Sequence, residues 1–230
     1  GKSGWDKQAP HMAVLDVVGY NYGLERYRGD HQKYPDRIMY ASEFMPPLSL
    51  QNWQTVEDLP YVIGNFSWTA MDYLGEAGVG LPRLIDIPAG KSGSGSNPMA
   101  GMMQFFSPDS WPVFNNFQGD LDLIGHPKTP YYYQHVVWKE SKIEMFVHRP
   151  IPSGKMEIVS PWGFPDELKS WSWEGHEGEK MQVHVYTRSR LVKLELNGKV
   201  IGEQAVDDSK SITATFEVPY EAGTLTARCF

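Results

Sequence analysis

The sequence predicts an α/β unit over residues 1–140, followed by an all-β unit over residues 141–230. In the first part, three short apolar runs are separated by polar segments of helix length. In the second part, apolar and polar residues alternate within short runs bounded by turn residues. Near-continuous apolar runs are typical of strands in a parallel sheet that is covered on both faces. Alternation is typical of strands with one solvated face.

Three strands are expected in the α/β part, at residues 14–22, 37–42 and 61–68. The polar segments at 25–34 and 49–59 are predicted to form short helices between them. This order implies right-handed βαβ units. In a parallel (β/α) barrel the chemistry lies at the carboxyl ends of the strands, so residues at those ends are candidates for a site.

Residues 77–118 show no clear periodicity and are predicted to form a long loop bordering the site, with a Gly/Ser-rich tip at 90–98. Loops of this length in compact domains are usually functional or disordered. The segment 130–138 then predicts a closing helix, because Pro130 suits the first turn of a helix.

The all-β part is predicted to be an immunoglobulin-like sandwich with its boundary near residue 140. An Asn-Gly pair at 197–198 predicts a tight hairpin turn directly after one strand. The expected strands are Ile143–Val147, Met181–Tyr186, Val192–Leu196 and Ile212–Val218.

The composition narrows the class of partner. A net charge of −7 argues against nucleic acid and anionic membranes, which select basic surfaces. No apolar run approaches the ~18 residues of a membrane span. Aromatic residues make up 13% of the chain, which suits a carbohydrate-binding protein and equally suits aromatic cores. The single cysteine excludes an internal disulfide, and the seven histidines lack zinc-ligand spacing.

Glu43 is the candidate nucleophile. It directly follows the second expected strand, where a rigid backbone can hold a carboxylate against the anomeric carbon of a sugar. A glutamate after a strand is also often a solvated loop residue, and position alone leaves both interpretations open.

Four further residues are candidates for substrate binding. Trp68, at the end of the third strand, fits the floor of a sugar subsite, and Asp72 offers acceptors for sugar hydroxyls. Asn21 and Tyr22, at the end of the first strand, fit hydrogen-bond donors to a neighbouring carboxylate, as does Tyr20 just before them. A core tryptophan, a loop carboxylate and structural residues at a barrel rim are the alternatives.

Taken together, these segments resemble glycoside hydrolase family 2, and most of all the β-galactosidases of the Bacteroides type. The resemblance covers the C-terminal part of the catalytic TIM barrel and the immunoglobulin-like domain that follows it. The segments that carry it are Asp16–Tyr22, Tyr40–Glu43, Asn65–Glu76, Gly119–Asp122, Trp171–His176, Val185–Thr187 and Leu194–Lys199.

The resemblance implies a partial (β/α)8 barrel made of its last three strands. It implies that Glu43 is the nucleophile in double-displacement hydrolysis of terminal β-galactosides, with Trp68 in the sugar subsite. It also implies that a tyrosine within Tyr20–Tyr22, with Tyr22 favoured, is bonded to the nucleophile. No cofactor is required for this chemistry, although some relatives bind magnesium or sodium. The family also implies a periplasmic or secreted bacterial protein.

One departure from the family pattern matters. The family's acid/base is the glutamate of an Asn-Glu pair, and the chain contains no Asn-Glu dipeptide. The expectation is therefore a fragment of a larger enzyme, with little or no activity alone. It would be completed by a missing N-terminal part or by pairing with another copy.

Two alternative functions stay open. The first is a related family 2 β-glucuronidase or β-mannosidase. The second is a non-catalytic carbohydrate-binding or assembly module built on residues 141–230, with Trp162, Trp171 and Trp173 as its sugar platform. Core packing of these tryptophans is the competing interpretation.

Overall fold

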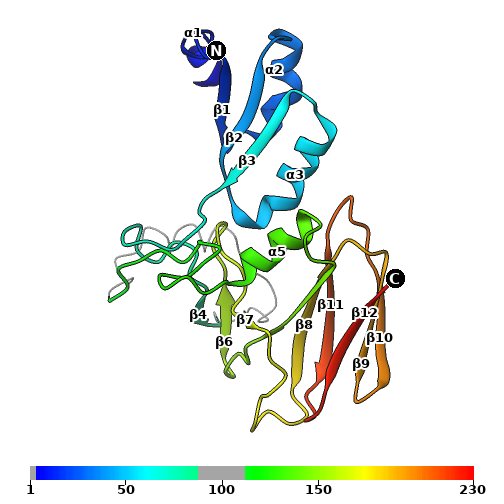
Figure 1. Cartoon of the computed structure of the whole chain (residues 1–230). Helices are drawn as coiled ribbons and strands as arrows, with labels where there is room; N and C mark the ends of the chain where they lie inside the picture. The colour runs from blue at the N-terminus through cyan, green and yellow to red at the C-terminus, as the bar shows by residue number, and fades with distance from the viewer. Residues whose placement is uncertain (1–3, 88–111) are drawn as a thin grey trace. The chain divides into compact units, whose positions relative to one another are not determined.

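A computed structural model of the chain describes residues 4–87 and 112–230. The chain forms two compact units, Gly1–Trp68 and Thr69–Phe230, here called unit 1 and unit 2. Figure 1 shows the elements of both. The compact units divide after Trp68, and a domain boundary near residue 140 stays a prediction. Residues 69–140 belong with the sandwich because their long-range contacts are made with it.

Unit 1 is a three-stranded parallel sheet with the order β1-β2-β3. The expected strand–helix–strand–helix–strand order is present, and the N-terminal helix and the short helical turn at Pro46–Leu48 were not predicted. The elements are α1 (Gly4–Met12), β1 (Val17–Asn21), η1 (Leu24–Arg26), α2 (Tyr27–Lys33), β2 (Ile38–Phe44), η2 (Pro46–Leu48), α3 (Ser49–Asp58) and β3 (Val62–Ser67).

One face of this sheet forms the core of unit 1. Val18, Met39 and Val62, one from each strand, are almost completely buried and pack with residues of the helical segments. A buried polar group lies in the same layer. The Tyr20 hydroxyl donates a hydrogen bond to Asp30 on α2 at 2.9 Å, which ties the sheet to that helix.

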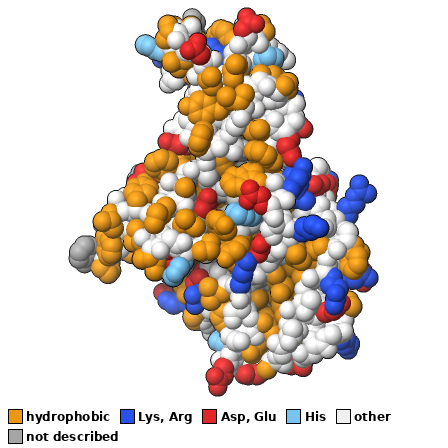
Figure 2. All heavy atoms as spheres, viewed as in Figure 1, with side chains coloured by type: hydrophobic (Ala, Val, Ile, Leu, Met, Phe, Trp, Pro, Cys, Tyr) orange, Lys and Arg blue, Asp and Glu red, His pale blue; other side chains and the backbone are white. Residues whose placement is uncertain are grey.

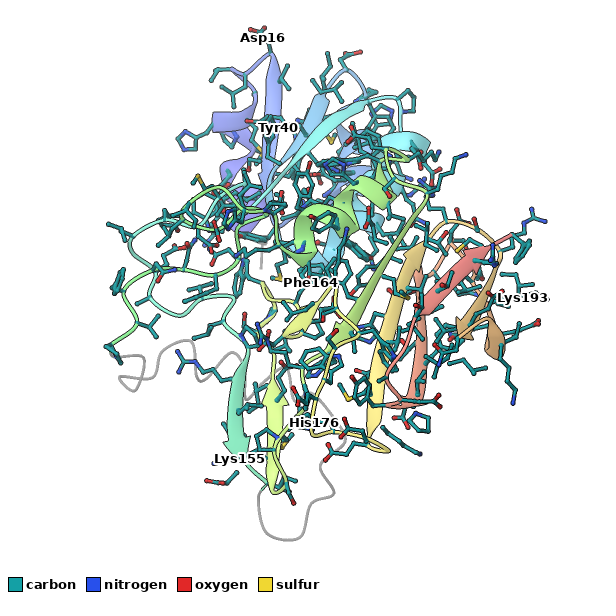
Figure 3. All side chains as sticks on the ribbon, turned by 60° about the horizontal axis from the view of Figure 1, so that its bottom comes forward. Asp16, Tyr40, Lys155, Phe164, His176 and Lys193 are labelled. Carbon is teal, nitrogen blue, oxygen red and sulfur yellow. The ribbon has the colours of Figure 1, made fainter. Side chains whose placement is uncertain are left out.

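The opposite face of the sheet carries apolar side chains that stay exposed. Val17, Ile38, Ile63 and Phe66 expose between 37% and 62% of their surface. Tyr40 lies across Gly19, where an added Cβ would come within 2.8 Å of its ring. Hydrophobic side chains gather over the three strands in Figure 2, and Tyr40 is labelled on the sheet in Figure 3.

Unit 2 contains two antiparallel sheets, a two-stranded ribbon and one described helix. Its sheets have the orders β10-β9-β12 and β11-β8-β5-β7, and the ribbon pairs β4 with β6. The elements are β4 (Arg83–Asp86), α5 (Thr129–Val137), β5 (Ile143–His148), β6 (Lys155–Ile158), β7 (Glu167–Leu168), β8 (Lys180–Thr187), β9 (Leu191–Leu196), β10 (Lys199–Ala205), β11 (Thr213–Pro219) and β12 (Leu225–Cys229).

The two larger sheets form a β-sandwich. Val183 and Val185 of β8 and Val192 and Leu194 of β9 are completely buried and belong to one hydrophobic cluster. Their positions alternate along each strand, as the sequence pattern predicted. The Asn-Gly turn is also confirmed: β9 and β10 are joined by residues 197 and 198, both with positive φ, which is the conformation of a type I′ turn.

Two expectations need correction. Part of the predicted loop over 77–118 is a strand, because β4 finds a partner in β6 about seventy residues later. A short strand whose partner is so distant leaves little local pattern in the sequence. The Gly/Ser-rich tip at 90–98 lies outside the described residues. The ribbon strand β6 and three edge strands of the sandwich (β7, β10 and β12) were also not predicted.

Among the residues that the structure describes, none of the helices has the length and hydropathy needed to cross a membrane.

Candidate functional site

The carboxyl ends of β1, β2 and β3 meet at one edge of the parallel sheet. The backbone N–H of Tyr22, just after β1, donates to the Glu43 carbonyl at 3.0 Å. The backbone N–H of Trp68, just after β3, donates to the Phe44 carbonyl at 2.9 Å. Three of the predicted site residues, Tyr22, Glu43 and Trp68, are thus brought to the same edge, with Glu43 on the central strand.

A β-bulge in β2 sets the position of Glu43. Tyr20 of β1 pairs with Ala41 of β2, but the next residue of β1, Asn21, pairs with Glu43. The pairing with β3 shifts over the same stretch of β2. The extra residue, Ser42, breaks the alternation of side chains. Bulges occur often beside active sites because they redirect a side chain at a strand end.

The Glu43 side chain is available for chemistry. The residue is half-buried, and across the described residues its carboxylate has neither an ion-pair nor a hydrogen-bond partner. A carboxylate that is held by the backbone but left without partners can act on a bound molecule. The Asp72 carboxylate, by contrast, accepts hydrogen bonds from Lys128.

Tyr22 adopts a strained backbone conformation. Its φ is +51°, in the left-handed region that non-glycine residues rarely occupy and that costs a bulky residue about 1–2 kcal/mol. Such strain often lies at functional sites. The Tyr22 side chain, 37% exposed, also lines a pocket of about 290 Å³ with Phe44, Leu48 and Asn52.

The contacts of Tyr20 remove it from the candidate hydrogen-bond partners of Glu43. Its side chain is completely buried, and its hydroxyl accepts a hydrogen bond from Arg37 at 2.9 Å while donating to Asp30. Burial raises the pKa of the Tyr20 hydroxyl. Tyr20 therefore has a structural role, and only Asn21 and Tyr22 remain as candidates from this strand end.

The Asp72 carboxylate is buried and hydrogen-bonded within unit 2. The residue is 5% exposed, and the Lys128 ammonium donates to both carboxylate oxygens at 2.7 and 2.8 Å. The Gly119 N–H donates to the same group. Burial raises the pKa of Asp72, although these partners oppose the rise. The contacts of Asp72 within unit 2 favour a structural role, while sugar binding by Asp72 stays a prediction.

Asp120 lies in the same network. Gln134 of α5 donates to its carboxylate at 2.9 Å. Burial raises the pKa of Asp120 to about 7, and the nearby Lys128 only partly offsets this effect. Lys128 itself was missed at the sequence level, because it lies fifty-six residues from Asp72 and in no periodic segment.

Metal binding finds no support in the described part of the chain. Nowhere in it do three or more His, Cys, Asp or Glu side chains gather in a way that could hold a metal ion. The magnesium or sodium of some relatives therefore stays a prediction.

Comparison with known proteins indicates the protein family to which this chain is similar. One family model, described as a domain of unknown function (DUF4982), matches residues 178–230. The crystal structure of a glycosyl hydrolase family 2 member from Bacteroides cellulosilyticus is 34% identical, with a TM-score of 0.80. That match covers 98% of this chain and 27% of the other chain.

Two curated proteins are also similar. One, from Formosa agariphila, is provisionally named a β-glucuronidase and is 29% identical over 96% of this chain and 17% of its own length. The other, the β-galactosidase BoGH2A from Bacteroides ovatus, is 22% identical over 92% of this chain and 24% of its own length. The chain thus spans about a quarter or less of the length of these relatives.

These likenesses define a segment of a glycoside hydrolase. The chain belongs to glycoside hydrolase family 2.

The strain at Tyr22 predicts that glycine at this position gives a more stable protein than alanine does, the reverse of the usual order. Tyr22→Gly should unfold with a free energy about 1 kcal/mol higher than Tyr22→Ala, because only glycine adopts positive φ without cost. Denaturant titration of both variants measures the difference. Tyr34 is the matched control, since it is 38% exposed with φ −136°. There Tyr34→Ala should be at least as stable as Tyr34→Gly. Equal stabilities at Tyr22 would contradict the strain.

The raised pKa of Asp120 predicts a pH-dependent stability. Between pH 4 and 7 the folded chain holds a proton that the unfolded chain has lost, so this group's contribution to stability falls as pH rises. Each pKa unit corresponds to about 1.4 kcal/mol. Asp120→Asn should therefore gain stability over the unmodified chain by a few kcal/mol on going from pH 4.5 to 7.5.

Denaturant titrations of both proteins at the two pH values measure this difference, in which the other titrating groups cancel. Asn can still accept the hydrogen bond from Gln134. A constant difference between the two proteins would show that Asp120 titrates normally.

Proposed function

We propose that Glu43 is the nucleophile of a retaining β-glycosidase that removes terminal β-galactosyl residues by double displacement. In this proposal the sheet of unit 1 is the last three strands of a (β/α)8 barrel, and the sandwich of unit 2 is the immunoglobulin-like domain that follows it. The observation that carries the proposal is the Glu43 carboxylate, which has no partner among the described residues and lies on the central strand, at a bulge, flanked by Tyr22 and Trp68.

The chemistry follows from the role of the carboxylate. The Glu43 oxygen attacks the anomeric carbon, and the bond to the leaving oxygen breaks while a second carboxylic acid protonates that oxygen. Water then attacks the glycosyl–Glu43 ester, and the second group, now a carboxylate, takes the proton from the water. Retention requires the two carboxyl groups to be about 5 Å apart.

Tyr22 and Trp68 have supporting roles in this proposal. Trp68 forms an apolar floor for the pyranose ring of the cleaved sugar, and Tyr22 donates a hydrogen bond that keeps the nucleophile oriented. Asn21, which pairs with Glu43 along the strand, offers an amide for a sugar hydroxyl. Oriented groups of this kind lower the barrier because no reorganisation is needed during the reaction.

The second carboxylate and the rest of the barrel are proposed to come from outside these 230 residues. The exposed apolar face carrying Val17, Ile38, Ile63 and Phe66 needs a cover. The outer edges of β1 and β3 have no strand partner among the described residues, and further parallel strands added there would continue the sheet. Another part of the same polypeptide satisfies both needs, and a second copy of the chain is the alternative.

The proposal also names the sugar that the enzyme removes. The Bacteroides ovatus relative is a β-galactosidase, which supports galactosides. The Formosa agariphila relative carries a provisional β-glucuronidase name, which favours glucuronides as the second candidate.

Bond cleavage by two carboxylates needs no metal. Secretion or a periplasmic location stays an expectation from the family.

Substitution of Glu43 tests the nucleophile. In the protein encoded by the whole open reading frame, Glu43→Gln should lower kcat on an aryl β-galactoside on the order of 10⁴-fold or more, because the amide cannot form the glycosyl ester. Parallel assays with an aryl β-glucuronide decide between the two sugars.

Glu57→Gln, on the exposed surface of α3, is the matched control and should retain full activity. The 230-residue chain alone should show little or no turnover. A Glu43→Gln protein that keeps more than a tenth of the unmodified kcat would rule out the nucleophile role.

A further inference from the structure

Unit 2 contains an aromatic pocket of its own, separate from any role of Glu43. Its volume is about 360 Å³, within the range of roughly 300–1,000 Å³ found for small-molecule sites. Prolines and aromatic rings dominate its wall. The rings are those of Phe117, Tyr132, Phe146, Trp162 and Phe164.

The aromatic wall is held in place by packing. Tyr132 of α5 lies 5.6 Å from Phe146 of β5, centre to centre. Phe164 contacts Tyr133 on the next position of α5 at 5.3 Å, and it is labelled beside that helix in Figure 3. Because Tyr132 and Phe146 project from a helix and a strand, this part of the wall is preorganised, which reduces the entropic cost of binding a ligand.

The lysines that line the pocket are neutralised by acidic partners. Lys128 pairs with Asp72 at 2.7 Å. Lys169 pairs with Glu144 at 2.5 Å, and its ammonium lies 3.4 Å from the centre of the Tyr132 ring. Neither ammonium is left to attract an anionic ligand.

The acidic residues of the pocket are also bonded to protein groups. Asp166 pairs with Arg149 at 2.9 Å. The Glu167 side chain is completely buried, and its two oxygens contact His184 at 2.6 Å and Tyr186 at 2.5 Å. A pocket whose charged side chains are already engaged by described protein partners suits a neutral ligand, since an ion would be desolvated without gaining a free counter-charge.

We propose that this pocket is a non-catalytic binding site for a neutral hexopyranose unit. The apolar C–H face of a pyranose stacks on an aromatic ring because its weakly positive hydrogens meet the negative face of the π system. The hydroxyls around the edge of the sugar can reach the outer parts of Lys128 and Asp166, which retain partial exposure.

Trp162 is the central ring of this proposal, and the other two candidate tryptophans are excluded from it. Trp171 donates its indole N–H to the Glu221 carbonyl and packs on Tyr220 at 5.2 Å. Trp173 packs against the hydrophobic core of the sandwich. Only Trp162 lines the pocket, so a sugar platform of three tryptophans is not what unit 2 presents.

Sugar titrations of the 230-residue chain test the proposal. Saturation-transfer NMR and calorimetry with methyl β-galactoside and lactose should show saturable binding, and glucuronate should bind more weakly. Trp162→Ala should weaken binding at least about tenfold, equivalent to 1.4 kcal/mol, whereas Trp162→Phe keeps a ring and should retain most of the affinity. Thermal melting confirms that each variant folds.

Two matched variants locate the binding. Phe230→Ala removes an aromatic ring that is 63% exposed in the same unit but outside the pocket, and it should bind as the unmodified chain does. Trp68→Ala should also bind normally, since the pocket does not depend on the site at Glu43. Absence of saturable binding, or a loss caused by Trp68→Ala and not by Trp162→Ala, would overturn the proposal.

Discussion

The register of β2 between its two parallel neighbours is the constraint on which the candidate site depends. Main-chain hydrogen bonds from Tyr22 and Trp68 to the carbonyls of Glu43 and Phe44 hold three strand ends at one edge. The bulge at Ser42 then places Glu43 outside the normal alternation of side chains. The backbone fixes the position of Glu43, and in the described part of the chain its carboxylate has no protein partner. The strain at Tyr22 belongs to the same arrangement.

The two units use carboxylates in opposite ways. In unit 2, Asp72, Asp120 and Glu167 are buried and bonded to protein groups, so they hold loops and strands together. In unit 1, Asp30 has this structural role, and Glu43 does not. The contrast matters for function, because a buried and paired carboxylate contributes to specificity of folding whereas an unpaired one at a strand end is available to a substrate.

Those parts of the fold and of the candidate site that depend on neighbouring residues in the sequence could be predicted. The parallel strands and the β9–β10 hairpin follow from apolar runs and an Asn-Gly turn, and the edge position of Glu43 follows from the strand that precedes it. What could not be predicted depends on distant partners. The bulge at Ser42 needs both neighbouring strands to define it, β4 needs β6, and the role of Asp72 is set by Lys128 far along the chain.

Trapping the covalent intermediate is the most direct measurement. The protein from the whole open reading frame would be treated with 2-deoxy-2-fluoro-β-galactosyl fluoride, whose 2-fluorine slows hydrolysis of the glycosyl ester, and its peptides analysed by mass spectrometry. The account predicts one fluorogalactosyl group, carried by the peptide that contains Glu43 and attached to that side chain. A label on another carboxylate of an active enzyme would contradict the assignment of Glu43 as nucleophile.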